Sequence, residues 1–464
     1  MVRLHDTLSN STIPLPEPPY EVKLYVCGIT PYAASHIGHA VPAIIFDALR
    51  RYLEYRGYSV RHITNFTDID DKLIDRAQSL GTTVEALAKQ YSDEYLRSLR
   101  ELNVLPAAAY PRATGEIAKI IEVIQGLEEK GFAYASGGDV YYRVRRKEGY
   151  GKLSHRKIDD LLSGARIDPT ELKEDPLDFA LWKGAKPGEP SWDSPWGPGR
   201  PGWHIECSAM AMEYLGPTID IHGGGADLIF PHHENEIAQS EAFTGQEFAR
   251  IWMHNALLRL GSEKMSKSVG NIISLEEVLE RWGSDATRVF VLSSHYRSPL
   301  TFTEEAMDAA KAGAERLRAA AFATTTGTPA ATPAAETITD QPAPALDAYR
   351  DRFTTAMDDD LGTAQALAVL FDLAREINRK RDSGQPITAE QALLRELAGV
   401  LGLTLAAPPE RTQEAAPFID LLVSLRSELR GAKQWALADR VRDGLAELGI
   451  ELHDSPEGTT WTAG

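Results

Sequence analysis

The sequence predicts an α/β protein whose main domain is a doubly wound parallel sheet of the Rossmann type, interrupted by an insertion. A helical bundle and a small C-terminal module follow it. Three observations predict this architecture. A strand–loop–helix–strand pattern opens the chain, strand patterns return after a Pro-, Gly- and Trp-rich stretch, and two Pro-rich breaks isolate the helical segments that follow.

The opening pattern is a βαβ unit. Residues 22–27 (VKLYVC) alternate and are rich in β-branched and aromatic side chains, residues 40–57 are amphipathic with helical period, and residues 58–66 (YSVRHITNF) again favour a strand. In such sheets, ligands bind beyond the carboxyl ends of the strands. Cys27 and Thr67 lie at such ends, so we expect the site there.

The later elements are assigned in chain order. Helices and then aromatic strands precede the segment KGAKPGEPSWDSPWGPGRPGW, which is typical of an insertion, and strands TIDIHGGG and RIWMHNALLRL complete the sheet. A Thr/Ala/Pro-rich stretch is a linker, since it cannot build a core. The expected boundaries are a main domain over 1–320 with its insertion at about 105–200, a linker at 321–345, a helical bundle at 346–405 and a C-terminal module at 417–464.

Composition favours a soluble globular protein. The chain has 464 residues, of which 43% are hydrophobic, and no apolar run long enough to cross a bilayer. The N-terminus has the pattern of neither an export signal nor a transit peptide, so we expect a cytoplasmic protein without a membrane partner.

The formal charge of −18 argues against a nucleic-acid-binding surface over the whole molecule. Only local basic clusters, at residues 143–147 and 426–442, could meet a nucleic acid. Each cluster could equally be a solvated face.

The segment SHIGHA places His36, Gly38 and His39 at the start of the first helix. A helix N-terminus offers unpaired N–H groups to phosphate, and Gly38 allows close approach of the backbone. The two imidazoles could stabilise the charge of a departing pyrophosphate. The motif is short, and the alternative is a pair of helix-capping histidines.

A second short motif contains Lys264, Ser266 and Lys267 in the segment KMSKS, between glycines 261 and 270. Two lysines three residues apart on a Gly-bounded loop could close over a triphosphate and neutralise its charge. The alternative is an exposed basic turn.

Four side chains form a candidate metal centre. The chain has only two cysteines, Cys27 and Cys207, and His232 and Glu236 lie four residues apart, on one face of a helix. Cysteine, histidine and carboxylate are ligand types that Zn²⁺ takes. His233, at the adjacent position, should point elsewhere. The alternative for the two cysteines is burial as inert hydrophobic residues.

The pairing of HIGH with a distant KMSKS resembles the signature of class I aminoacyl-tRNA synthetases. The segments LYVCGIT, NFTDIDDKLIDRA, PGWHIECSAM, DIHGGGADLIFPHHENEIAQSEA, WMHN and MDDDLGTAQALAVLFDLAREIN narrow the resemblance to the cysteinyl-tRNA synthetase family and span nearly the whole chain. The resemblance implies activation of L-cysteine with ATP and Mg²⁺, transfer to the 3′ end of tRNA(Cys), one Zn²⁺ per chain, and a monomer. It also implies that the insertion is the family's connective domain and the C-terminal module its anticodon-binding module.

The resemblance also implies roles for individual residues. Cys27, Cys207, His232 and Glu236 would be the zinc ligands, and Gly28, Thr67 and Trp203 would bind cysteine. Thr67 could instead be a strand-end cap and Trp203 a structural aromatic. The residues expected to bind ATP are His36, Gly38, His39, Lys264, Ser266 and Lys267, of which His36, His39, Lys264 and Lys267 would be catalytic.

Zinc would have a physical purpose in such an enzyme. Serine has almost the shape of cysteine, and packing differences of that size discriminate only about 10- to 200-fold. A thiophilic ion separates the two amino acids where shape cannot.

Three smaller expectations concern neighbouring residues. His204 and Glu206, beside Cys207, could orient the metal ligands or have a surface role. For Asp68, Asp70 and Asp71 we favour a role as negative charges at a helix N-terminus, where they complement the helix dipole. Trp435 could stack on an anticodon base, but its helical spacing favours a core position in the C-terminal module.

One segment departs from the family. Cysteinyl-tRNA synthetases usually read CGPTVYD, whereas this chain has Ile29, Pro31 and Ala33 at the variable positions. Ile29 and Pro31 resemble the cysteine:glucosaminyl-inositol ligase of mycothiol synthesis, which is the alternative function. That relative lacks the C-terminal end that is present here. A regulatory RNA-binding protein is a third possibility, but it would be expected to lose the histidines and lysines that this chain keeps.

Overall fold

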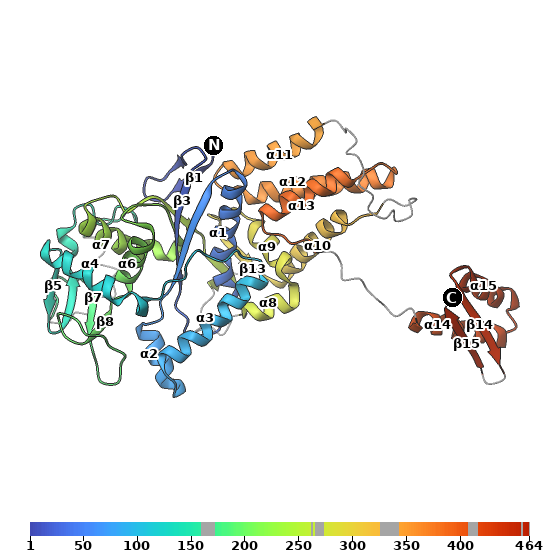
Figure 1. Cartoon of the computed structure of the whole chain (residues 1–464), viewed down its shortest axis with the longest axis horizontal. Coiled ribbons are helices and arrows are strands. Elements are labelled where there is room, and N and C mark those ends of the chain that lie inside the picture. The colour runs from blue at the N-terminus through green and yellow to red at the C-terminus, as the bar shows by residue number, and fades with distance from the viewer. Residues whose placement is uncertain are drawn as a thin grey trace. The chain divides into compact units, whose positions relative to one another are not determined.

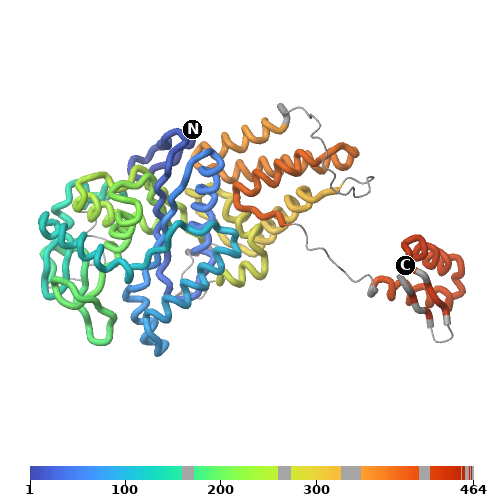
Figure 2. The backbone as a smooth tube through the Cα atoms, in the orientation of Figure 1, coloured from blue at the N-terminus to red at the C-terminus, as the bar shows by residue number. Residues whose placement is uncertain are grey.

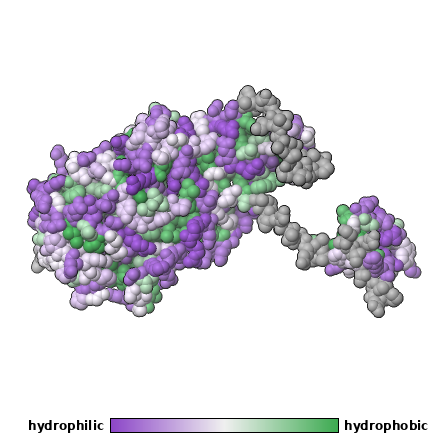
Figure 3. Space-filling model, viewed as in Figure 1, coloured by the Kyte–Doolittle hydropathy of each residue, from purple (hydrophilic) through white to green (hydrophobic). Residues whose placement is uncertain are grey.

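The computed structural model divides into two compact units, Met1–Leu405 and Ala406–Gly464, which are described separately (Figure 1). Within the described residues, no helix is long and apolar enough to cross a membrane. On the face drawn in Figure 3, hydrophilic residues predominate and apolar ones are scattered among them. The structure describes residues 1–158, 172–260, 263–264, 273–324, 343–406, 416–455 and 458–463.

A four-stranded sheet lies at the centre of the larger unit, in the order β10-β9-β3-β4. All three strand pairings are parallel, as predicted for a Rossmann-type sheet. The strands are β3 (Glu21–Ile29), β4 (Ser59–Phe66), β9 (Ile219–Gly225) and β10 (Ala249–Asn255).

Alternating side chains of β3 supply a core on each face of the sheet. Leu24 and Val26 pack in one core with helix α1 (Ile37–Tyr55), whereas Tyr25 packs in the other core with helix α6 (Trp203–Leu215). A strand buried on both faces is the arrangement that a parallel sheet requires. It also directs successive residues at the end of β3 toward different helices.

The chain between β4 and α6 forms a separate antiparallel sheet, in the order β5-β6-β7-β8. Its glycines allow the strands to approach: a Cβ at Gly199 would lie 2.2 Å from the Trp182 indole nitrogen, and one at Gly202 would lie 2.1 Å from the Ala180 carbonyl oxygen. The elements are α2 (Asp71–Leu80), α3 (Val84–Glu101), α4 (Ile117–Glu129), β5 (Ala133–Ser136), β6 (Asp139–Tyr142), β7 (Phe179–Gly184) and β8 (Gly199–Pro201).

Helices complete the larger unit. The backbone trace shows the helices over residues 343–400 returning beside those that follow the sheet (Figure 2). The helices are α7 (Glu234–Thr244), α8 (Leu275–Trp282), α9 (Ser284–Leu292), α10 (Glu304–Ala321), α11 (Ala343–Asp358), α12 (Thr363–Asp382) and α13 (Thr388–Val400). Short strands are β1 (Arg3–Asp6), β2 (Ser11–Pro14), β11 (Leu258–Leu260), β12 (Glu263–Lys264) and β13 (Leu300–Phe302).

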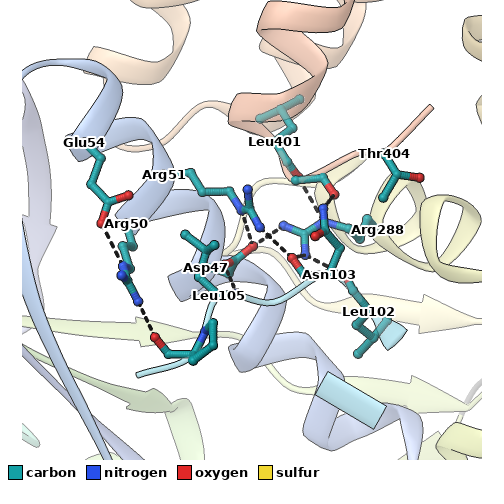
Figure 4. A network of polar contacts seen from close by, with 12 residues as sticks. Asp47, Arg50, Arg51, Glu54, Leu102, Asn103, Leu105, Arg288, Leu401 and Thr404 are labelled. Atoms are coloured by element: carbon teal, nitrogen blue, oxygen red, sulfur yellow. Dashed lines mark hydrogen bonds and ion pairs between the residues drawn. The ribbon is translucent and has the colours of Figure 1, made fainter. Parts of the chain in front are cut away.

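A buried ion pair ties these helices to the sheet domain (Figure 4). The guanidinium of Arg288, on α9, bonds to the carboxylate of Asp47, on α1. Arg288 also donates to the carbonyl oxygens of Leu102 and Leu401, at 3.0 and 2.9 Å. One side chain thus satisfies groups from three other segments, including the end of α13.

The smaller unit contains α14 (Ala416–Gly431), α15 (Trp435–Glu447) and a hairpin of β14 (Ile450–Ser455) and β15 (Gly458–Ala463). The expectation that Trp435 is a core residue is wrong, because its side chain is 56% exposed. Ala438 and Leu445 supply the buried positions of α15, while Trp435 is the first residue of the helix. Helical spacing alone does not show where the packed part of a short helix begins.

Candidate active site

A cavity of about 440 Å³ opens at the carboxyl ends of the parallel strands, where the sequence predicts the site. Its walls come from the loop after β3, the start of α1 and the segments after β9 and β10. Of the residues with expected roles, those lining it are Cys27, Gly28, His36, Gly38, His39 and Trp203.

Gly28 is required by the close approach of β3 to β4. A Cβ at this position would lie 1.6 Å from the Asn65 carbonyl oxygen, and the Gly28 N–H donates to Asn65 Oδ1 at 2.9 Å. Thr67, at the end of β4, is buried and is not among the residues lining the cavity. The structure thus places Gly28, but not Thr67, in the lining of the cavity.

The four predicted metal ligands converge from distant parts of the chain. Cys27 Sγ lies 3.7 Å from Cys207 Sγ and 3.5 Å from Glu236 Oε1, and His232 Nε2 lies 3.1 Å from the same oxygen. Their ligand atoms all lie within 4.8 Å of one another. Four ligands at about 2.0–2.3 Å from one tetrahedral zinc ion would be about 3.3–3.8 Å apart, so the donor set fits such an ion.

The expectation that His233 points elsewhere is wrong. Its Nε2 lies 3.3 Å from Cys27 Sγ, and Cys27, His222, His233 and Glu236 form a second group with metal-ligating geometry. Residues Ile229–His233 form an irregular turn in which Phe230 has φ −139°, and α7 begins only at Glu234. The helical period therefore does not govern the directions of the two adjacent histidines.

A chain of buried histidines extends from this group. His222 Nε2 lies 2.8 Å from Glu236 Oε2, His233 Nδ1 lies 2.8 Å from His254 Nε2, and His254 Nδ1 lies 2.7 Å from the Thr7 hydroxyl. Burial lowers the pKa of His254 to about 3 and that of His233 well below its ordinary value, so both are neutral at physiological pH. The available sequence signal was a histidine at the end of each of three strand-like or Pro-bounded segments, DIHGGG, FPHH and WMHN.

His204 and Glu206 occupy different environments beside Cys207. His204 Nδ1 lies 2.9 Å from His232 Nδ1, so it can orient that ring. Glu206 is fully buried, and neither carboxyl oxygen has a hydrogen-bond partner among the described residues. Burial raises the pKa of Glu206 well above its usual range. The nearby Thr67 hydroxyl offsets part of this increase.

The two thiols are held in their neutral form by the surrounding protein. Burial raises the pKa of Cys27 well above its ordinary value, and the neighbouring Cys207 and Glu236 raise it further. For Cys207 the bond from Cys27 lowers the pKa, but burial and Glu236 leave it raised. A cluster of groups that ionise only at such cost matches a site completed by a cation.

His36 and His39 cap the start of α1. The Gly38 N–H donates to His36 Nδ1 at 3.1 Å, the His36 N–H donates to His39 Nδ1 at 3.4 Å, and the two rings stack at 3.9 Å. Pro42 lies in the first turns of this helix and also lines the cavity. The capping alternative is therefore correct in geometry, and it also places both rings at the cavity wall.

Two other groups of expected residues can now be placed. Lys264 ends strand β12, whereas Ser266 and Lys267 lie outside the described residues. Asp70 is the N-cap of α2, accepting from the Leu73 N–H at 2.7 Å, and Asp71 lies in the first helical turn, as predicted for both. Asp71 also pairs with Lys183, whereas Asp68 lies before the cap and accepts from the Thr114 N–H and hydroxyl.

Trp203 is 42% exposed at the rim of the metal group, and its ring stacks on that of His232 with centroids 4.4 Å apart. It therefore joins the cavity wall to the predicted ligands.

The comparisons with known proteins follow this geometry. A family model described as "tRNA synthetases class I (C) catalytic domain" matches residues 16–312, and a DALR domain model matches residues 352–406. A cysteine–tRNA ligase of Dehalococcoides mccartyi is 54% identical, with 99% of each chain covered. The chain belongs to the cysteine–tRNA ligase family. A second family member, from Heliobacterium modesticaldum, is 49% identical, again over 99% of each chain.

Solved structures of related enzymes show the same fold as this member of the family. Methionyl-tRNA synthetase of Mycobacterium tuberculosis, in complex with methionyl-adenylate, superposes with a TM-score of 0.58 at 19% identity, covering 87% of this chain and 94% of the other. Leucyl-tRNA synthetase of Agrobacterium radiobacter gives 0.57 at 12% identity, covering 86% and 87%. The predicted fold class is thus confirmed.

Proposed function

We propose that this chain is a cytoplasmic, monomeric cysteinyl-tRNA synthetase, which activates L-cysteine with ATP and Mg²⁺ and transfers it to the 3′ end of tRNA(Cys). The observation that carries the proposal is the convergence of Cys27, Cys207, His232 and Glu236 at the wall of the cavity that also contains the start of α1. An amino-acid site and a nucleotide site are thereby adjacent.

The donor set of two sulfurs, an imidazole and a carboxylate fits one Zn²⁺ ion. When bound, Zn²⁺ would ligate the thiolate sulfur of the substrate, which the hydroxyl of serine cannot replace. The protein's part is to fix the ligands: His204 orients His232, and His222 orients Glu236 through its 2.8 Å contact. Trp203, stacked on His232, would form one wall of the pocket for the amino-acid side chain.

The nucleotide half of the site lies at the N-terminus of α1. The first-turn N–H groups and the positive end of the helix dipole favour the triphosphate, and Gly38 leaves room for it. His36 and His39 would stabilise charge on the departing pyrophosphate, and Lys264 and Lys267 would help to neutralise it. Positioning of cysteine beside the α-phosphate would supply much of the rate.

The domain organisation that we propose assigns residues 1–320 to catalysis, with a connective insertion at about 105–200, and residues 346–405 to the helical bundle. Residues 417–464 would read the anticodon. The exposed Trp435 ring supports the last assignment, because an aromatic face can stack on an unpaired base. Coverage of nearly the full length of tRNA ligases also favours tRNA over a glucosaminyl-inositol acceptor.

The deciding experiment is ATP–pyrophosphate exchange followed by transfer. We expect exchange with cysteine and none above background with serine, and charging of tRNA(Cys) without ligation to glucosaminyl-inositol. Lys267→Ala should abolish exchange, whereas Lys186→Ala, an exposed lysine of the insertion, should leave it unchanged. Equal exchange with serine, or transfer to the sugar amine, would overturn the proposal.

A further inference from the structure

The loop between α11 and α12 has an unusual backbone. Asp360 and Leu361 are both in the left-handed region, with φ of 54° and 55°, and both are buried. Consecutive left-handed residues other than glycine are disfavoured, so the surroundings must hold this loop in place. Strain of this kind, when it is maintained, points to a function for the residues that carry it.

The side chain of Asp360 is the main anchor of the loop. Its Oδ1 accepts from the His5 N–H at 2.8 Å and from the Tyr296 hydroxyl at 2.6 Å. Its Oδ2 accepts from Nε and Nη2 of Arg297, at 2.8 and 2.6 Å. Each carboxylate oxygen thus accepts two hydrogen bonds.

The main chain of Asp360 contacts the same two segments. Its N–H donates to the Arg3 carbonyl oxygen at 3.0 Å, and its carbonyl oxygen lies 3.0 Å from His295 Nε2. One residue of the helical bundle therefore fixes both β1 and the segment 295–297.

The segment 295–297 in turn holds a wall of the cavity. The Tyr296 carbonyl oxygen accepts from the Ala256 N–H at 2.8 Å, and residues 255–258 line the cavity. The same stretch continues into β11, which pairs in parallel with β13 and then leads through β12 to Lys264. The two strands that follow Ala256 and Tyr296 are thus paired from Leu258 and Leu300 onward.

We propose that Asp360 is a positioning residue for the nucleotide, acting through Tyr296 and the main chain of Ala256. This inference rests on the proposed function. The predicted metal ligands lie on β3, α6, α7 and the turn before α7, outside the segment 255–258.

Asp360 also contacts β1, from which Thr7, His254 and His233 lead toward Cys27, but it makes that contact through Oδ1 and its main chain. A change confined to Oδ2 would therefore act mainly on the ATP side of the site.

The test is Asp360→Asn, measured by cysteine-dependent ATP–pyrophosphate exchange. Asparagine keeps Oδ1 and the shape of the side chain but places an amide donor opposite Arg297. We expect KM for ATP to rise about tenfold, because small displacements of a positioned group have large kinetic effects. KM for cysteine and zinc content should change less than about twofold, within the context-dependence of such effects.

Asp358→Asn is the matched control. Asp358 ends the same helix and also anchors the bundle, accepting from the Tyr52 hydroxyl and from Arg56 Nη1, each at 2.6 Å. These partners lie at the far end of α1. The control should lower thermal stability without raising KM for ATP.

Tyr296→Phe removes the hydrogen bond from the Tyr296 hydroxyl to Asp360 and keeps the carbonyl that accepts from Ala256. This second variant tests the inference if Asp360→Asn does not fold. It should raise KM for ATP in the same direction, and the double variant should be less than additive. The inference would be overturned if KM for ATP were unchanged in Asp360→Asn, or if KM for cysteine rose as much as KM for ATP. An equal rise of KM for ATP in Asp358→Asn would also overturn it. Absence of exchange in the natural protein would instead overturn the proposed function.

Discussion

The Sγ atoms of Cys27 and Cys207 lie 3.7 Å apart, one at the end of β3 and the other in the first turns of α6. A disulfide would bring them to about 2.05 Å, whereas two ligands of one zinc ion would keep this spacing. The strand and the helix pack through a common core, so the pair is set by the fold itself.

Replacing one of these sulfurs should separate metal binding from folding. In Cys207→Ser we expect zinc content to fall well below one ion per chain and exchange with cysteine to fall at least about 100-fold, because a ligand is lost. Zinc is measured by elemental analysis and activity by pyrophosphate exchange. Met212→Leu, on the same helix and buried, keeps the volume and should retain both; full zinc content in the serine variant would contradict the assignment.

Removing the partner of a metal ligand should have a milder effect. His204→Ala deletes the 2.9 Å contact to His232, and we expect zinc affinity to fall about 10- to 100-fold. Competition with a chromophoric chelator measures this change. His453→Ala, in the smaller unit, is the control and should bind zinc like the natural protein; an unchanged affinity in both variants would show that His204 does not orient the ligand.

The buried ion pair in Figure 4 predicts a large stability effect. Arg288→Met removes one of two guanidinium partners of Asp47, which keeps Arg51, and leaves two buried carbonyl groups without a donor, so the free energy of unfolding should fall by about 1–3 kcal/mol. Denaturant titration measures it. Lys89→Met breaks the exposed pair with Asp93 on helix α3 and should cost less than about 1 kcal/mol. Similar losses in both variants would contradict the argument.

A pH dependence follows from His62. Burial, and to a smaller extent Arg50, lowers its pKa from 6.5 to about 4. The unfolded chain therefore takes up this proton first as the pH falls, so stability is lost between pH 6.5 and 4, by at most about 3 kcal/mol. His62→Leu should reduce the pH dependence of the unfolding free energy over that interval, while the buried His204, His232 and His254 keep part of it. An identical pH profile in the variant would exclude His62 as a source.

Shortening the chain should separate activation from transfer. A protein ending at Leu405 contains the whole of the larger unit. We expect it to keep exchange within a few-fold, since each unit has its own contacts, but to lose most charging of tRNA(Cys). Charging by the shortened chain at the full rate would contradict an anticodon role for the smaller unit.

Local sequence patterns predicted much of the fold. Apolar alternation and helical period are carried by side chains near in sequence, so β3, α1 and β4 appear close to where the patterns place them. The four predicted metal ligands lie close together, as expected: Cys27 is near the end of β3, and α6 and α7 bring Cys207 and Glu236 to it.

The rest depended on contacts that no local pattern encodes. His233 points toward Cys27, in a second candidate group with His222, because an irregular turn replaces the helix that the spacing suggested. The ion pair of Arg288 and Asp47 joins two residues that are far apart in the sequence. The left-handed loop at Asp360 is held by residues from two other segments. Such relationships are set by tertiary packing rather than by propensity.

Pro42 gives the start of α1 a second chemical character. A proline nitrogen carries no hydrogen, so the helix lacks the backbone hydrogen bond that residue 42 would otherwise donate to the carbonyl oxygen of Gly38. The Gly38 N–H is already bonded to His36 Nδ1, so this turn combines a capped N–H with a carbonyl that receives no bond from residue 42. An alanine at this position could donate to that carbonyl and satisfy it within the helix.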